Sequence, residues 1–234
     1  MSKIEIMNSE MNKIDNDDVK EAYISGSEDY LIPLVFPYYL IRLEGGSAAT
    51  SNKYLGTERV PYLGHAGVLI INGQNGKTKY YEYGRYPPGD LGRTRSVPIN
   101  NVKITPKKMI TITSLKQVLR KISASSGQKG RIEGGILRSD NIYDKAVEYC
   151  EKKIKENDDL NRKPYSIYSN SCVTFVRELT VYLGFYAPTI VSYTSLAGYF
   201  GSRVPTLYMQ QFQLIITVRD LFYNYKTNEL EVNF

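Results

Sequence analysis

The only histidine of this 234-residue chain, His65, stands at the head of an apolar run that ends at Ile71. Far along the chain, Cys172 begins a second apolar stretch, which has the pattern of the first turns of a helix. An imidazole at the start of a strand and a thiol at the start of a helix are the two groups that a thiol hydrolase requires. The pair predicts nucleophilic chemistry, because a helix end favours the thiolate and an imidazole can accept or hold its proton.

Each residue of this pair also has a purely structural interpretation. Cys172 follows an Asn-Ser pair of good N-cap residues, but it could be one more small buried residue of an apolar helix face. A single histidine beside an apolar strand is often only a hydrogen-bonded structural residue. The glycines Gly64 and Gly67 around His65 favour the chemical interpretation, because they let another segment approach closely.

A third polar residue is expected to fix the orientation and tautomer of the imidazole. The segment 72–76 predicts a tight turn, and 78–83 has the pattern of a return strand. In the resulting hairpin Glu82 lies opposite Gly67 and diagonal to His65, on the same sheet face. The missing side chain at Gly67 would leave room for Glu82 to lean toward the ring.

The assignment of Glu82 depends on the register of this hairpin, since a slip of one residue moves its side chain to the other face. An exposed strand glutamate is the alternative interpretation. Asp90 and Asn72 are weaker substitutes for the same orienting role.

The remaining pattern predicts an α+β fold in which a helix packs on an antiparallel sheet. A flexible or loosely docked tail is expected over residues 1–25, and a single domain over 26–234. Further strands are expected at 38–43, 97–104 and 131–137, and residues 213–218 are strand-like. Further helices are expected after a capping box at Ser114, over 142–156 after a cap at Asp140 or Asn141, and from Cys172 to Gly184.

Composition limits the partners and cofactors. The net charge of +6 suits an anionic polymer, but its basic residues are scattered and no nucleic-acid motif is present. No apolar run reaches the ~20 residues of a membrane span, and residues 1–20 lack the apolar core of a signal peptide. Cys150 lies on an apolar helix face, which favours a buried inert thiol over a disulfide. We expect no metal and no cofactor, because one histidine and two cysteines lack the spacing of zinc ligands.

The segments Gly64–Val68, Tyr81–Tyr83 and Ser171–Val176 together resemble the circularly permuted branch of the papain-like NlpC-type cysteine peptidases. In that branch the histidine strand precedes the cysteine helix. The stretch Gly64–Tyr86, with its tyrosine-rich segment 81–86, is also similar to peptidoglycan-targeting effectors of type VI secretion. The match covers about residues 60–90 and 165–184.

The resemblance implies a nucleophile Cys172, a base His65, an orienting Glu82 and an oxyanion donor in the backbone N–H of Cys172. It also implies a cysteine amidase or endopeptidase that cuts peptide stems of bacterial peptidoglycan. Such an effector would be exported without a cleaved leader and act in the periplasm of a target cell. A cognate immunity protein and a component of the secretion machine are its expected partners.

Two other functions remain open from the sequence. The same catalytic residues could serve a thiol acyltransferase or lipid hydrolase, with the apolar stretch 31–43 lining a tunnel. Alternatively, the chain could be a binding module in which Cys172 and His65 are buried far apart.

Overall fold

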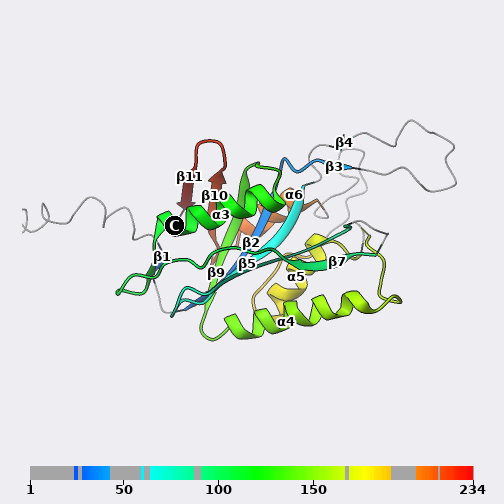
Figure 1. The fold of residues 1–234 in the computed structure, drawn as a ribbon, viewed down its shortest axis with the longest axis horizontal. Helices are drawn as coiled ribbons and strands as arrows, with labels where there is room; N and C mark the ends of the chain where they lie inside the picture. The colour runs from blue at the N-terminus through cyan, green and yellow to red at the C-terminus, as the bar shows by residue number, and fades with distance from the viewer. Residues whose placement is uncertain are drawn as a thin grey trace, which may run out of the picture.

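The centre of the molecule is a seven-stranded antiparallel sheet with the strand order β11-β10-β9-β2-β5-β6-β7 (Figure 1). The computed structural model describes residues 24–25, 28–42, 59–60, 64–86, 91–166, 169–190, 204–215 and 217–233. The strands of the sheet are β2 (Asp29–Phe36), β5 (His65–Ile71), β6 (Thr78–Gly84), β7 (Arg93–Ser96), β9 (Ile132–Ser139), β10 (Arg219–Asn224) and β11 (Glu229–Asn233). Two short pairs lie outside it, β1 (Ile24–Ser25) with β8 (Met109–Ile110), and β3 (Ile41–Arg42) with β4 (Arg59–Val60).

Helices cover both faces of this sheet in the described part of the chain (Figure 1). One face carries α3 (Ile112–Ser126), and the other carries α4 (Tyr143–Lys155), α5 (Cys172–Tyr182) and α6 (Pro205–Gln213). The short 3-10 helix η1 (Glu156–Asp158) follows α4. The predicted α+β class with an antiparallel sheet is therefore confirmed.

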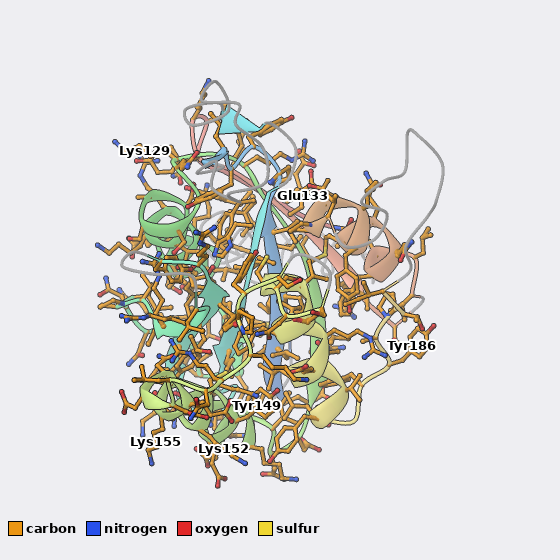
Figure 2. All side chains as sticks on the ribbon, turned by 90° about the vertical axis from the view of Figure 1, so that its right-hand side faces the viewer. Lys129, Glu133, Tyr149, Lys152, Lys155 and Tyr186 are labelled. Carbon is orange, nitrogen blue, oxygen red and sulfur yellow. The ribbon has the colours of Figure 1, made fainter. Side chains whose placement is uncertain are left out.

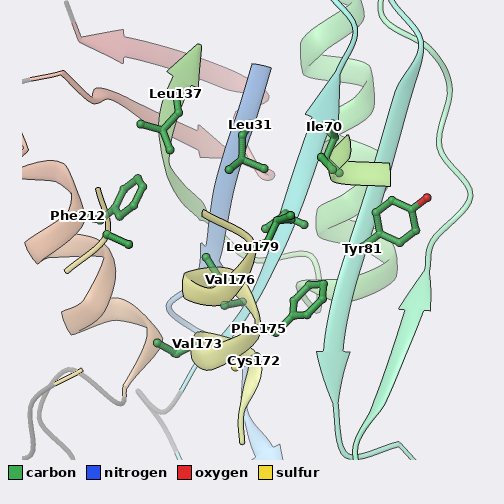
Figure 3. Close-up of a cluster of buried hydrophobic side chains, with 14 of the residues drawn as sticks. Leu31, Ile70, Tyr81, Leu137, Cys172, Val173, Phe175, Val176, Leu179 and Phe212 are labelled. Carbon is green, nitrogen blue, oxygen red and sulfur yellow. The ribbon is translucent and has the colours of Figure 1, made fainter. Parts of the chain in front are cut away.

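Strands β2 and β5 form the middle of the sheet and are buried on both faces. Alternate side chains of β2 enter the two cores, with Leu31 under α4, α5 and α6 and Ile32 under α3. A strand covered on both sides needs apolar residues at every position, which explains the continuous apolar runs in the sequence. Figure 3 shows α5 lying across one face, with Val176 and Leu179 directed toward Leu31 and Ile70.

The α5 helix begins and ends where its sequence predicts. Ser171 is the N-cap, and its side chain and that of Thr174 form a reciprocal capping box with the backbone. The helix stops before Gly184, whose φ of 86° a glycine adopts without strain. These two signals fix Cys172 as the first residue of the helix.

Other boundaries differ from the prediction. The N-cap of α3 is Thr111 rather than Ser114, whose own N–H donates to the Thr111 hydroxyl. The expected cap of α4 at Asp140 or Asn141 is wrong, because Ile142 is the N-cap and makes no side-chain cap bond.

Three predicted strands are also wrong in part. The 38–43 strand shrinks to β3 because β2 ends at Phe36 and a turn follows. Residues 97–104 form no strand, since the N–H of Val102 bonds to the β5–β6 turn at Gly76, and the pairing strand is β7 instead. In the predicted 213–218 strand, Gln213 is the last residue of α6, and the described residues 214, 215, 217 and 218 lie between α6 and β10. The 131–137 strand is confirmed as most of β9.

The predicted tail over residues 1–25 lies almost wholly outside the described residues, and only Ile24 and Ser25 are seen, paired with β8. The single-domain division stays a prediction. Positive charge is spread over the surface: Lys152 and Lys155 lie at one end of the molecule and Lys129 at the other (Figure 2).

Asp29 ties three distant segments together. Its Oδ1 accepts a hydrogen bond from the N–H of Gly73 in the hairpin turn, at 3.1 Å. Its Oδ2 accepts from the N–H of Tyr143, the first residue of α4, at 2.9 Å. Asp29 is only 5% exposed and supplies the cap that Ile142 cannot.

We expect Asp29→Ala to lower the free energy of unfolding by about 2–4 kcal/mol, because two buried N–H donors lose a charged acceptor. Urea denaturation followed by circular dichroism measures the loss. Asp140→Ala, at an exposed aspartate, is the matched control and should stay within about 0.5 kcal/mol of the parent. Equal stabilities of the two variants would contradict the role assigned to Asp29.

Candidate active site

The β5–β6 hairpin has the predicted register. Gly67 faces Glu82 and Val68 faces Tyr81, so His65 and Glu82 project from the same sheet face. The Nε2 atom of His65 lies 3.1 Å from Oε2 of Glu82. Glu82 has no exposed surface, so its interpretation as an exposed strand glutamate is wrong.

Hydrogen-bond donors surround the buried carboxylate of Glu82. Oε2 accepts from Nε2 of His65 and from the hydroxyl of Tyr80, at 2.9 Å. Oε1 accepts from Nε and Nη2 of Arg95, which stands directly opposite Glu82 on β7. Burial alone would raise the pKa of Glu82, but the bond to His65 and the charges of His65 and Arg95 lower it to about 2. The carboxylate is therefore an anion under all ordinary conditions.

Gly67 provides the space that this arrangement needs, although not in the way predicted. A Cβ atom at Gly67 would lie 2.3 Å from the hydroxyl oxygen of Tyr80. The Tyr80 phenol thus fills the vacant volume and from there donates to Glu82. Gly84 has a similar part, since a Cβ there would lie 2.8 Å from the ring of Tyr86.

Tyr86 follows β6, and its ring lies over Gly84. Its hydroxyl reaches Nε2 of His65 at 3.2 Å. The His65 ring also stacks on Phe36 and lies beside Tyr39, with ring centroids 6.0 Å and 5.3 Å apart. These contacts leave the His65 side chain 10% exposed and its orientation well defined.

The protonation of His65 follows from Cys172 and Glu82 beside it. Burial by itself lowers the pKa of His65, but hydrogen bonds to the side chains of Cys172 and Glu82, together with the Glu82 charge, raise it to about 10. The imidazole is therefore cationic at neutral pH, between a thiol and a carboxylate.

Cys172 meets His65 at the end of strand β5, although the two residues belong to opposite layers. Alternation directs His65 to the α3 side, whereas Cys172 packs with the α5 core. They come together because His65 is the first residue of β5 and Cys172 the first of α5. Figure 3 shows Cys172 at the end of α5, where β5 begins. Cys172 is 4% exposed.

Tyr165 completes the surroundings of the thiol. Its phenol lies close enough to the side chain and the backbone N–H of Cys172 for both to affect its pKa. Burial and the Cys172 charge raise the pKa of Tyr165. The ring stacks on Tyr83 at 5.9 Å, and the Tyr83 hydroxyl accepts a bond from Asn170. The N–H predicted as an oxyanion donor thus has a tyrosine hydroxyl beside it.

The other candidates lie away from this cluster or outside the described residues. Asp90 falls among residues 87–90, which the structure does not describe. Asn72 is not an orienter of His65: its Oδ1 accepts from Gln74 and Asn75 within the turn, at the opposite end of β5. Cys150 is free and fully buried in the core on α4; burial raises its pKa.

Within the described ranges, no group of three His, Cys, Asp or Glu side chains could hold a metal ion. No helix among those same residues is long and apolar enough to cross a bilayer.

The sequence interpretation missed Tyr80, Tyr86, Tyr165 and Arg95. Tyr80 could have been found, because residues two apart on a strand share a face and Tyr80 stands two before Glu82. Arg95 was missed because the next strand was expected at 97–104, whereas β7 covers Arg93–Ser96 and pairs with β6.

A thiol, an imidazole and a buried carboxylate thus come together at one end of β5, and similarity to known proteins gives the class of this chain. The family model described as "Type VI secretion system effector TseH-like" matches residues 31–183. The chain belongs to this family of type VI secretion effectors.

One solved structure is similar to this chain, the "Crystal structure of Type VI secretion system effector, TseH". Its sequence is 37% identical to this chain, and the two structures match with a TM-score of 0.69 over 90% of this chain and 100% of that one. No curated protein matches the chain.

The pH dependence of stability tests the proton on His65. The folded pKa of about 10 exceeds the ordinary 6.5, so the native state holds a proton that the unfolded chain releases. The stabilisation is complete below pH 6.5 and is lost as pH rises toward 10. The unfolding free energies of the parent and His65→Gln should therefore converge between about pH 6 and about pH 9 in urea titrations. A constant difference would contradict a cationic His65.

Proposed function

We propose that this effector is a cysteine hydrolase that cleaves amide bonds in the peptide stems of bacterial peptidoglycan. Cys172 is the nucleophile, His65 the acid and base, and Glu82 the residue that orients His65. The observation that carries the proposal is the single histidine of the chain, held between the Cys172 thiol and the ionised Glu82. The proposed fold is the permuted papain-like one, in which strand β5 with the histidine precedes helix α5 with the cysteine.

The reaction begins from a thiolate–imidazolium pair. Since Nε2 of His65 contacts Glu82, we assign Nδ1 to the thiol. The Cys172 thiolate attacks the scissile carbonyl carbon, and a C–S bond forms while the oxygen becomes an oxyanion. The backbone N–H of Cys172 donates to that oxygen, and the Tyr165 hydroxyl beside it can donate too.

Collapse of this intermediate breaks the C–N bond, and the imidazolium gives its proton to the leaving amine. Neutral His65 then takes a proton from water, whose oxygen attacks the acyl carbon. The C–S bond breaks, the carboxylic acid product leaves, and the thiolate and imidazolium are restored. Glu82 stays ionised throughout and stabilises the imidazolium in both steps.

The two alternative functions, a lipid hydrolase and a binding module, agree less well with the geometry of the site. The lipid-hydrolase alternative needed the apolar stretch 31–43 to line a tunnel, but residues 31–36 form the buried middle strand β2. The binding-module alternative needed Cys172 and His65 to lie far apart, whereas the Cys172 side chain is close enough to raise the pKa of His65.

Family membership adds the biological setting of the proposal. A type VI effector is delivered by a secretion machine, and a producing cell needs an immunity protein against it. We propose that the chain acts on the cell wall in the periplasm of the target cell. The net charge of +6 supports attraction to an anionic wall polymer.

Purified peptidoglycan sacculi test the activity directly. The parent protein should release new muropeptides, identified by mass spectrometry, whereas Cys172→Ala and His65→Ala should release none. Cys150→Ala is the matched control, because it removes the other, buried thiol and should retain activity. Release of fatty acid from phospholipid vesicles with intact sacculi would transfer the proposal to a lipid substrate, and activity in Cys172→Ala would contradict the nucleophile.

The role of Glu82 predicts a graded response. Glu82→Ala should lower kcat/KM by about 10²–10⁴-fold, since the ring loses its orientation and its counter-charge. Glu82→Gln should lose less, because an amide oxygen can still hold the ring. In Glu82→Gln the pKa of His65 should fall, so the alkaline limb of the pH–rate profile should move to lower pH. Parental turnover by Glu82→Ala would exclude Glu82 as the orienter.

A further inference from the structure

Two oxygen atoms contact the same nitrogen of His65. Oε2 of Glu82 lies 3.1 Å from Nε2, and the hydroxyl oxygen of Tyr86 lies 3.2 Å from it. Glu82 is a strand residue of β6, but Tyr86 stands beyond the end of that strand. The direction of the imidazole therefore depends on whatever holds these two side chains together.

Arg95 contacts both of them. Its Nε and Nη2 atoms bind Oε1 of Glu82, the oxygen that His65 does not use. The centre of its guanidinium lies 4.0 Å from the centroid of the Tyr86 ring. Because Arg95 pairs with Glu82 across β6 and β7, its backbone position is set by the sheet. The side chain is 44% exposed, so it lies at the outer side of the cluster.

These contacts need the shape of arginine as well as its charge. A guanidinium is planar, so it can direct two N–H groups at a carboxylate in its plane while its face covers an aromatic ring. Lysine carries the same charge at a single point and cannot make both contacts in this way.

We propose that Arg95 is a positioning residue that fixes Glu82 and Tyr86, and through them the ring of His65. Its effect on the rate rests on the proposed hydrolase function, whereas its effect on His65 does not. If Arg95 acted on His65 through its charge alone, its removal would change the pKa of His65 in the opposite direction to that expected from a positioning role. Removing a nearby positive charge would make protonation of His65 easier, but losing the orientation of Glu82 would make it harder.

The polar and titratable groups around the imidazole are Glu82 on β6, Tyr86 after β6, Tyr39 after β2 and Cys172 on α5. Glu82 is the group among them that Arg95 binds through a salt bridge. A change in His65 caused by replacing Arg95 is therefore expected to pass through Glu82 and Tyr86.

The single histidine makes the measurement unambiguous. In protein labelled with ¹³C at histidine, one Cε1 resonance reports the titration of His65. We expect its pKa to fall by about one pH unit in both Arg95→Lys and Arg95→Met. Arg131→Met is the matched control: Arg131 has a similar exposure, pairs with Glu133 and lies over Phe222, and its removal should leave the resonance unchanged.

Kinetics on sacculi supply the second measurement. Both Arg95 variants should lower kcat about tenfold to a hundredfold with little change in KM, because the ring and not the substrate is misplaced. Unfolding midpoints show whether a variant has lost its fold. If Arg95→Met has lost it, the test rests on Arg95→Lys.

An unchanged or raised His65 pKa in folded Arg95→Lys would overturn the proposal, since the charge would then suffice. Failure of the hydrolase proposal has a different signature. No Cys172-dependent release from sacculi would be seen with the parent protein, while the resonance of His65 would still respond to Arg95.

Discussion

A charged carboxylate with no exposed surface is the constraint around which this site is built. Even after the protein relaxes, transfer of an isolated carboxylate from water to a protein interior costs roughly several kcal/mol. Glu82 avoids that cost because His65, Tyr80 and Arg95 direct N–H or O–H groups at both of its oxygens. Those three residues come from three adjacent strands, so the sheet must form in one register for the charge to be tolerated.

This constraint couples the stability of the fold to the chemistry of the site. Without the anion, His65 would be a buried imidazole whose neutral form is favoured. With the anion and the thiol beside it, the ring holds its proton to about pH 10. The same interaction that makes burial of Glu82 possible thus prepares the imidazolium that a thiolate needs as its counter-ion.

Glycines and tyrosines together create the space for this network. Gly67 leaves the volume that the Tyr80 hydroxyl occupies, and Gly84 lets Tyr86 fold back over β6. Tyr165 extends the same principle to the thiol on α5. Tyrosine suits these positions because its ring packs as an apolar group while its hydroxyl satisfies a buried polar atom.

The sequence by itself determined the parts of the site that depend on local pattern. The turn at 72–76 sets the hairpin register, and Ser171 and Gly184 delimit the cysteine helix, so Glu82 opposite Gly67 and Cys172 at a helix start follow from nearby residues. Only the tertiary structure decided that Arg95 faces Glu82, that Asp29 caps α4, and that His65 and Cys172 meet at the end of β5. Those contacts join residues far apart in the chain, and they are selected by the packing of whole layers, which no local periodicity encodes.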